Sequence, residues 1–217
     1  MTTLKSTTQR LRARAKTVAI EATLAEVFSD HTSDGASIAF AAAHLNAGGK
    51  PVLWVQDRLS RKETGRPYLA GLPNAMQLIH VDVSNARDLL WAMEEGLRCP
   101  VLGGVIGEVW GDPAMLDFTA SKRLALRSEA HNVPAWLIRH AGHPNLSAAR
   151  LRWRVGSLPA MNNPYDAHAP GQPLWRAELF RARWRTPGEW VVHHDRDGMH
   201  FGHGIDRQTA PLQREAL

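Results

Sequence analysis

Residues 29–57 read SDHTSDGASIAFAAAHLNAGGKPVLWVQD, a polar turn followed by two apolar segments. The first segment, SIAFAAAHLNA, predicts a helix that ends at the glycine pair 48–49, because glycine readily caps a helix C-terminus. The second, PVLWVQD, is a short and nearly continuous apolar run, which predicts a strand covered on both faces. A strand of this kind belongs to a sheet with helices on its two sides.

The alternation of helix and strand continues to residue 140. A polar loop is expected between the first two strands, and Ser84 is expected to cap the helix that follows the second. The repetition of strand, helix and strand predicts an α/β fold with a mainly parallel sheet and right-handed crossovers. Strands are expected at 51–57, 76–83, 101–109 and 133–139, and helices near 37–47, 85–98 and 116–131.

The pattern changes after residue 140. Residues 150–155 alternate strictly, with arginines expected on one face of a strand and apolar side chains on the other. Two further strand-like segments, LWRAELFRARWRT and EWVVHHD, are joined by a PGE turn, and together they predict a C-terminal antiparallel β extension. The chain is therefore expected to divide into a basic N-terminal arm (1–19), an α/β core (20–145), an Arg/Trp-rich extension (146–205) and a tail (206–217).

The composition is that of a globular protein, with 44% hydrophobic and 22% charged residues among 217. No apolar run approaches the ~18 residues needed to span a bilayer. The first residues lack the apolar stretch of a secretory signal. A single cysteine, Cys99, excludes an internal disulfide. We therefore expect a cytoplasmic protein with no membrane segment.

The net charge of +5 is unevenly distributed. Residues 1–16 hold five basic groups and no acid, and residues 150–190 hold seven arginines against three acids. Between these zones the chain is slightly acidic. Basic zones suit nucleic acid or an acidic partner, and a solvated arginine face explains them equally well.

The turn SDHTSDGAS stands where a P-loop protein carries G-x-x-x-x-G-K-[ST]. Asp30 takes the place of the first glycine, while Gly35 and Ser37 match the second glycine and the hydroxyl position. Ala36 replaces the lysine that balances the β- and γ-phosphate charges, and Asp34 adds a negative charge. Each unit-charge interaction is worth about 4 kcal/mol at ~4 Å and an effective dielectric near 20. We therefore expect a degenerate P-loop, no ATPase activity and no cofactor.

Four segments together resemble the ImuA family, the RecA/SulA-like accessory proteins of bacterial damage-induced mutagenesis. They are GGKPVLWVQD (48–57), LLWAMEEGLRCPVLGGVIGEV (89–109), LDFTASKRLALRSEAHNVPAWLIR (116–139) and LWRAELFRARWRTPGEWVV (174–192). The resemblance implies a RecA-like fold. It also implies that Asp57 stands where active RecA proteins position the attacking water, and that Glu108 stands where the Walker B acid lies. The Gly-rich segment that usually precedes the P-loop region in the family is missing.

Two sets of residues could bind a metal. Asp57 and Glu108 are acids at the ends of expected strands, the usual ligand crevice of an α/β sheet, but polar strand-end residues often cap helices instead. The eleven histidines include the clusters HAGH (140–143) and HHDRDGMHFGH (193–203), which have neither helical i,i+4 spacing nor a zinc pattern with cysteine. We expect no metal site and no catalytic residue.

The C-terminal block combines arginine with tryptophan, the residue types that dominate the energetics of protein interfaces. The same pair suits single-stranded nucleic acid, and a third alternative packs the tryptophans in the core while the arginines face water. The candidates for contact with a partner or DNA are Arg150, Arg152, Arg154, Trp175, Arg181, Arg183, Trp184 and Arg185.

The resemblance implies a non-catalytic adaptor in SOS-induced translesion synthesis, a DNA repair and mutagenesis pathway. Its partners would be an ImuB-like protein, an error-prone polymerase α subunit and RecA, with DNA contact weak and secondary. Self-association through a RecA-type groove stays open. Two alternatives also remain: a SulA-like inhibitor of cell division, and a DNA-binding RecA-like recombination protein or ATPase.

Overall fold

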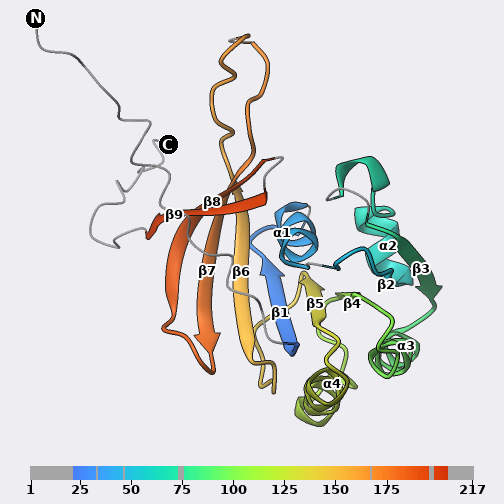
Figure 1. The fold of residues 1–217 in the computed structure, drawn as a ribbon. Coiled ribbons are helices and arrows are strands. Elements are labelled where there is room, and N and C mark those ends of the chain that lie inside the picture. The colour runs from blue at the N-terminus through green and yellow to red at the C-terminus, as the bar shows by residue number, and fades with distance from the viewer. Residues whose placement is uncertain are drawn as a thin grey trace, which may run out of the picture.

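The computed structural model describes residues 22–204 except 33, 46, 73–75, 167 and 196–197. The expected N-terminal arm (1–19) and tail (206–217) lie outside the described residues. Within them one nine-stranded sheet has the order β3-β2-β4-β5-β1-β6-β7-β8-β9 (Figure 1). The strands are β1 (Leu24–Ser29), β2 (Val52–Asp57), β3 (Leu78–Val83), β4 (Gly104–Trp110), β5 (Ala135–His140), β6 (Leu151–Leu158), β7 (Leu174–Ala182), β8 (Gly188–Asp195) and β9 (Gly198–Gly204).

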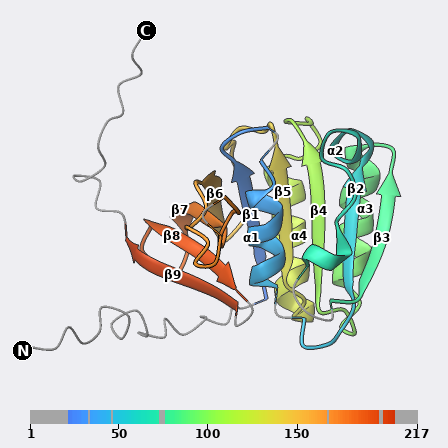
Figure 2. The same ribbon diagram turned by 90° about the horizontal axis from the view of Figure 1, so that it is seen from above.

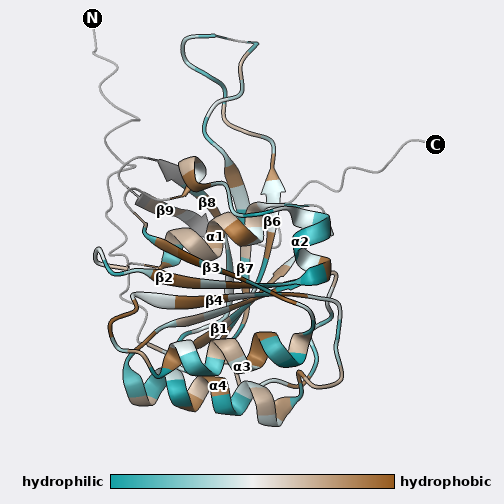
Figure 3. Ribbon diagram, turned by 90° about the vertical axis from the view of Figure 1, so that its right-hand side faces the viewer, coloured by the Kyte–Doolittle hydropathy of each residue, from teal (hydrophilic) through white to brown (hydrophobic). Residues whose placement is uncertain are grey.

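Four helices flank the parallel part of the sheet. α1 and α2 cover one face, and α3 and α4 cover the other, so the sheet is the middle of three layers (Figures 2 and 3). None of the helices in the described ranges is long and apolar enough to cross a membrane. The helices are α1 (Ala36–His44), α2 (Arg58–Thr64), α3 (Ala86–Leu97) and α4 (Phe118–His131), with a 3-10 turn at Leu69–Gly71.

The expected α/β fold is confirmed. The four expected strands are β2, β3, β4 and β5, and β4 lies between β2 and β5 in the interior of the sheet. All neighbouring pairs from β3 to β6 are parallel, which is the arrangement that strand–helix–strand repetition predicts. The last three strands are antiparallel, as expected for the C-terminal extension.

Three local expectations need correction. β6 pairs in parallel with β1, so the antiparallel part begins only with β7. The expected loop after β2 contains α2, because the Asp57 carboxylate caps a helix by accepting a hydrogen bond from the Ser60 amide (2.7 Å). Asn85, not Ser84, caps α3, since its side chain accepts from the Asp88 amide (3.0 Å).

Two apolar clusters fill the space on either side of the sheet. The cluster under α1 is rich in aromatic residues, with Phe40 in contact with Trp136, Trp153 and Trp175. The antiparallel end of the sheet curls toward α1 (Figure 1). The ring centroid of Phe201 in β9 lies 5.7 Å from that of His44 in α1. The aliphatic cluster on the other face packs α3 and α4 onto the parallel strands.

Candidate functional site

The segment that the sequence predicts to be a degenerate P-loop forms the loop between β1 and α1, and its polar groups bond to one another. Asp34 accepts a hydrogen bond from the Ala36 amide (2.8 Å), so a carboxylate of the chain itself lies at the start of α1. That start is where a P-loop would present its amides to phosphate. The Ser37 hydroxyl, which would face magnesium, is fully buried and hydrogen-bonds the Ser29 hydroxyl (2.6 Å).

Strands β6 and β7 add further partners to this loop. The backbone amide and hydroxyl of Ser157 donate to Asp34 at 2.6 and 2.7 Å. Partial burial works to raise the pKa of Asp34, but the hydrogen bonds from Ser157 and Ala36 outweigh it and the pKa is lowered. Asp30 pairs with Arg176, and a Cβ at Gly156 would clash with the Asp30 carboxylate. Both acids of the loop are therefore held by donors from the same chain.

Glu108, which the family resemblance places at the Walker B position, lies in β4 and is fully buried. Its Oε1 accepts from Trp54 Nε1 (2.5 Å) and Gln56 Nε2 (3.0 Å), and its Oε2 lies 2.7 Å from His140 Nε2. Through these contacts the buried side chain of Glu108 links β4 to β2 and to β5. His140, from the first histidine cluster, thus has a protein partner.

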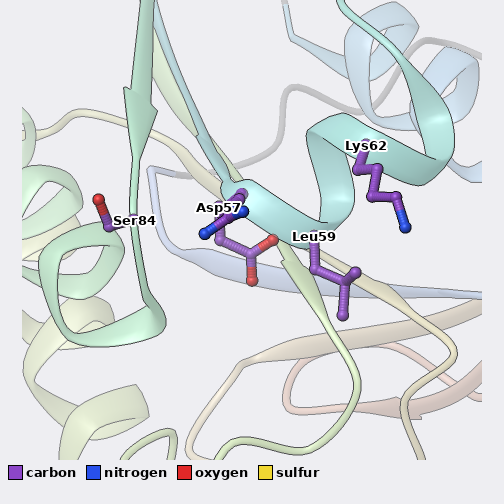
Figure 4. A pocket seen from close by; sticks show the side chains of 5 residues that line it. Asp57, Leu59, Lys62 and Ser84 are labelled. Carbon is purple, nitrogen blue, oxygen red and sulfur yellow. The ribbon is translucent and has the colours of Figure 1, made fainter.

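Asp57 ends β2 and borders a cavity of about 390 Å³, which Arg58, Leu59, Lys62 and Ser84 also line (Figure 4). The carboxylate accepts two backbone hydrogen bonds, from Ser60 (2.7 Å) and from Trp110 (3.2 Å). Asp57 and Glu108 therefore share no hydrogen-bond partner. No group of three His, Cys, Asp or Glu side chains in the described part of the chain is arranged to hold a metal ion.

The three arginines around β6 share a face, as the alternation predicts, but that face is not a free basic surface. Arg152 is buried and bonds to the fully buried Glu26 (Nε–Oε2, 2.7 Å). Arg154 pairs with Glu178 of β7 (2.6 Å). Arg150 pairs with Glu129 of α4 through Nε (2.6 Å) and Nη2 (3.2 Å).

The tryptophans of the C-terminal block divide into two groups. Trp153 and Trp175 are 2% and 6% exposed and belong to the aromatic cluster under α1. Trp184 is 52% exposed, with the guanidinium of Arg183 5.5 Å from its ring centroid. Trp175 is therefore a core residue, and Trp184 is a surface residue.

Arg181, Arg183 and Arg185 were expected on one strand, but β7 ends at Ala182. Arg183 and Arg185 lie in the turn between β7 and β8, which spans residues 183–187. Arg181 and Arg183 instead meet Phe118 of α4 around a cavity of about 270 Å³. Phe118, which sequence reasoning missed, follows the helix-capping residue Asp117 and is 42% exposed.

No known protein-family model matches the chain. Protein ImuA from two strains of Caulobacter vibrioides is 30% identical to it over 167 residues. The match covers 72% of this chain and 64% of those relatives, so the chain spans less than two thirds of their length.

The crystal structure of the RadB recombinase superposes with a TM-score of 0.54 at 14% identity. It covers 82% of this chain and 90% of that one, which supports the RecA-like fold and nothing finer. The resemblance drawn from the four sequence segments is confirmed, and the chain belongs to the ImuA family.

Proposed function

We propose that this protein is a non-catalytic, RecA-like adaptor of damage-induced mutagenesis, which acts in SOS-induced translesion synthesis by binding other proteins. Family membership supports the pathway, and the resemblance suggests an ImuB-like protein, an error-prone polymerase α subunit and RecA as partners. The RecA-like fold serves as a scaffold in this proposal.

The observation that carries the non-catalytic part is the position of Asp34. In a P-loop the amides at the helix start bind phosphate, whereas here Asp34 accepts from the Ala36 amide and is held in place by Ser157. An incoming phosphate would meet a negative charge and would have to displace these hydrogen bonds. The buried hydroxyl pair of Ser29 and Ser37 supports the same conclusion for magnesium.

The experiment that tests the adaptor function is calorimetric titration of the whole chain with the ImuB-like protein of the same genome. We expect direct binding, weakened about 30-fold by Trp184→Ala, which corresponds to ~2 kcal/mol for an interface hot spot. Trp91→Ala is the matched control, because Trp91 is 66% exposed on α3, far from the C-terminal block in the chain. Failure of the wild-type chain to bind would contradict the adaptor function.

A parallel experiment tests the absence of nucleotide chemistry. ATP with magnesium at millimolar concentration should neither raise the melting temperature nor be hydrolysed above the rate of a buffer blank. A stabilisation of several degrees would indicate binding by mass action and would favour the RecA-like ATPase alternative. Filamentous growth on overproduction without DNA damage would favour the SulA-like alternative.

A further inference from the structure

A pocket of about 270 Å³ lies where the start of α4, the segment before β6 and the end of β7 meet. Because β7 runs antiparallel to β6, this pocket lies at the N-terminal end of β1 and β6, at the opposite sheet edge from the degenerate P-loop. We call it the corner pocket. Its lining residues are Phe118, Ser147, Ala148, Ala149, Arg150, Arg181, Ala182 and Arg183.

Internal hydrogen bonds hold the floor of the corner pocket. Ser147 donates its hydroxyl to the buried Glu26 (2.7 Å), and the amide of Ala148 donates to the Ser121 hydroxyl (3.0 Å). The amide of Arg183 donates to the carbonyl of Arg150 (2.9 Å), which fixes the end of β7 against the segment before β6. The pocket is therefore formed before any ligand arrives, which lowers the entropic cost of binding.

The charges around the corner pocket are not balanced. Arg150 is neutralised by its two bonds to Glu129. For Arg181 and Arg183, in contrast, no carboxylate among the described side chains lies within ion-pair distance, and Glu129 attracts Arg183 only from farther away. The Arg181 guanidinium donates a long hydrogen bond to the Ser147 carbonyl (3.4 Å), and the Arg183 guanidinium lies over the Trp184 ring. Two exposed guanidinium groups thus border one small cavity.

Apolar side chains accompany these charges. Phe118 is 42% exposed at the pocket wall, and Trp184 is 52% exposed beside Arg183. Exposed aromatic rings next to arginine are typical of the centre of a protein interface. The ligand therefore has both negative charge and an apolar group.

The size and the distribution of charge identify the class of ligand. The cavity is smaller than the ~300–1,000 Å³ of typical small-molecule sites and has room for one or two side chains. Nucleic acid would need a continuous basic track, but Glu129 and Glu178 neutralise the neighbouring Arg150 and Arg154. A carboxylate matches the planar fork of an arginine in two hydrogen bonds.

We propose that the corner pocket binds an acidic peptide segment of a partner protein, with its carboxylates on Arg181 and Arg183 and an apolar side chain against Phe118. This inference rests on the adaptor function and specifies the chemistry of what the adaptor recognises.

Selection of displayed random short peptides on the whole wild-type chain tests the inference, followed by fluorescence anisotropy with the selected sequences. We expect the selected peptides to be enriched in Asp and Glu next to an aromatic or aliphatic residue. The double variant Arg181→Glu with Arg183→Glu should bind them roughly tenfold or more weakly, since it places like charges opposite the ligand. Phe118→Ala should weaken binding without changing its dependence on salt.

The matched control is Arg58→Glu with Arg87→Glu, which changes the net charge equally on α2 and α3. It should bind the selected peptides with wild-type affinity. Equal weakening in both double variants, or selected peptides without acidic residues, overturns the inference. Tighter binding of a labelled octathymidylate than of the selected peptides also overturns it, in favour of nucleic acid.

These outcomes are separate from a failure of the adaptor function. If the ImuB-like protein binds the wild-type chain and the Arg181/Arg183 variant equally well, and no acidic peptides are selected, the corner pocket inference fails while the adaptor function stands. If the ImuB-like protein does not bind at all, the adaptor function fails, and the peptide selection still decides the chemistry of the pocket.

Discussion

The loop after β1 and the turn after β7 both carry several charged residues, but the two regions differ in what those charges contact. In the loop, Asp30 bonds to Arg176, and Asp34 bonds to Ala36 and Ser157. In the turn region, Arg181 and Arg183 have no carboxylate within ion-pair distance among the described residues, and Glu129 acts on Arg183 only from farther away. A charge with an internal partner stabilises the fold, whereas an exposed charge without one is available to a ligand.

Strand direction explains the difference. β6 is parallel to β1, so its C-terminal end delivers Ser157 directly to the loop after β1. β7 is antiparallel to β6, so its own C-terminal end projects from the opposite sheet edge. There α4 supplies one carboxylate, Glu129, which pairs directly with Arg150 and attracts Arg183 only from farther away. Among the described residues, Arg181 at the end of β7 and Arg183 in the turn therefore have no direct ion pair.

The largest expected effect is the difference in stability between a variant that loses an ion-paired arginine and one that loses an arginine without an ion pair. Arg152→Ala removes the ion-pair partner of the buried Glu26 and should lower the free energy of unfolding by about 3–5 kcal/mol. Arg181→Ala removes an exposed group and should stay within ~0.5 kcal/mol of the wild type. Urea denaturation of both variants measures the contrast, and similar losses would show that the partner of an arginine does not decide its role.

Tryptophan gives a second contrast of similar size. Trp175→Ala opens a cavity in the aromatic cluster under α1 and should cost about 3–5 kcal/mol of stability. Trp184→Ala should cost less than ~1 kcal/mol and leave the near-ultraviolet circular dichroism of the buried tryptophans in place. If Trp184→Ala unfolds the chain, Trp184 is a core residue and the corner pocket loses its aromatic neighbour.

His44 ends α1, lies close enough to the β7–β8 turn to be affected by the charge of Arg185, and should make the stability of the fold depend on pH. Burial lowers its pKa from 6.5 to about 4, and the positive charge of Arg185 in the β7–β8 turn acts in the same direction. Because the unfolded chain takes up the proton first, stability is complete above pH 6.5 and falls as the pH decreases toward 4. This group contributes about 3 kcal/mol to that loss.

The measurement for His44 is the difference between the wild type and His44→Gln. Urea denaturation at several values between pH 7 and pH 4 should show the wild type losing more stability than the variant over this interval. The same pH dependence of stability in the two proteins would mean that the pKa of His44 does not differ between the folded and the unfolded chain.

The smallest effect concerns Asp34. Asp34→Ala removes the acceptor for Ala36 and Ser157 and should cost about 1–2 kcal/mol at neutral pH. Since the pKa of Asp34 is lowered in the folded chain, its contribution is present above the ordinary value of 3.8 and is lost as the pH falls through the folded value. The variant should therefore approach the wild type in acid, as thermal unfolding below pH 4 would measure. A difference that persists there would point to lost packing.

Neither β1 nor β9 was predicted from the sequence, and for β1 a buried charge explains why. β1, LAEVFS, has Glu26 in the middle of its apolar run, and no local feature indicates that this carboxylate is buried. Its partners, Ser147 and Arg152, lie more than a hundred residues later in the chain. Glu26 and Arg152 meet only because β6 pairs with β1 in the sheet.

The sequence by itself determined the four strands and three helices of the α/β alternation, because apolar periodicity and capping act within a few residues. It also predicted that Ala36 stands where a P-loop carries its lysine. Only the tertiary structure decided which charges have partners. Arg150, Arg152 and Arg154 look alike in the sequence, yet they pair with carboxylates from α4, β1 and β7, respectively. Arg181 and Arg183 also look alike, and neither has a carboxylate within ion-pair distance among the described residues. The physical reason is that an ion pair depends on the distance between groups, and strand order sets that distance for residues far apart in the chain.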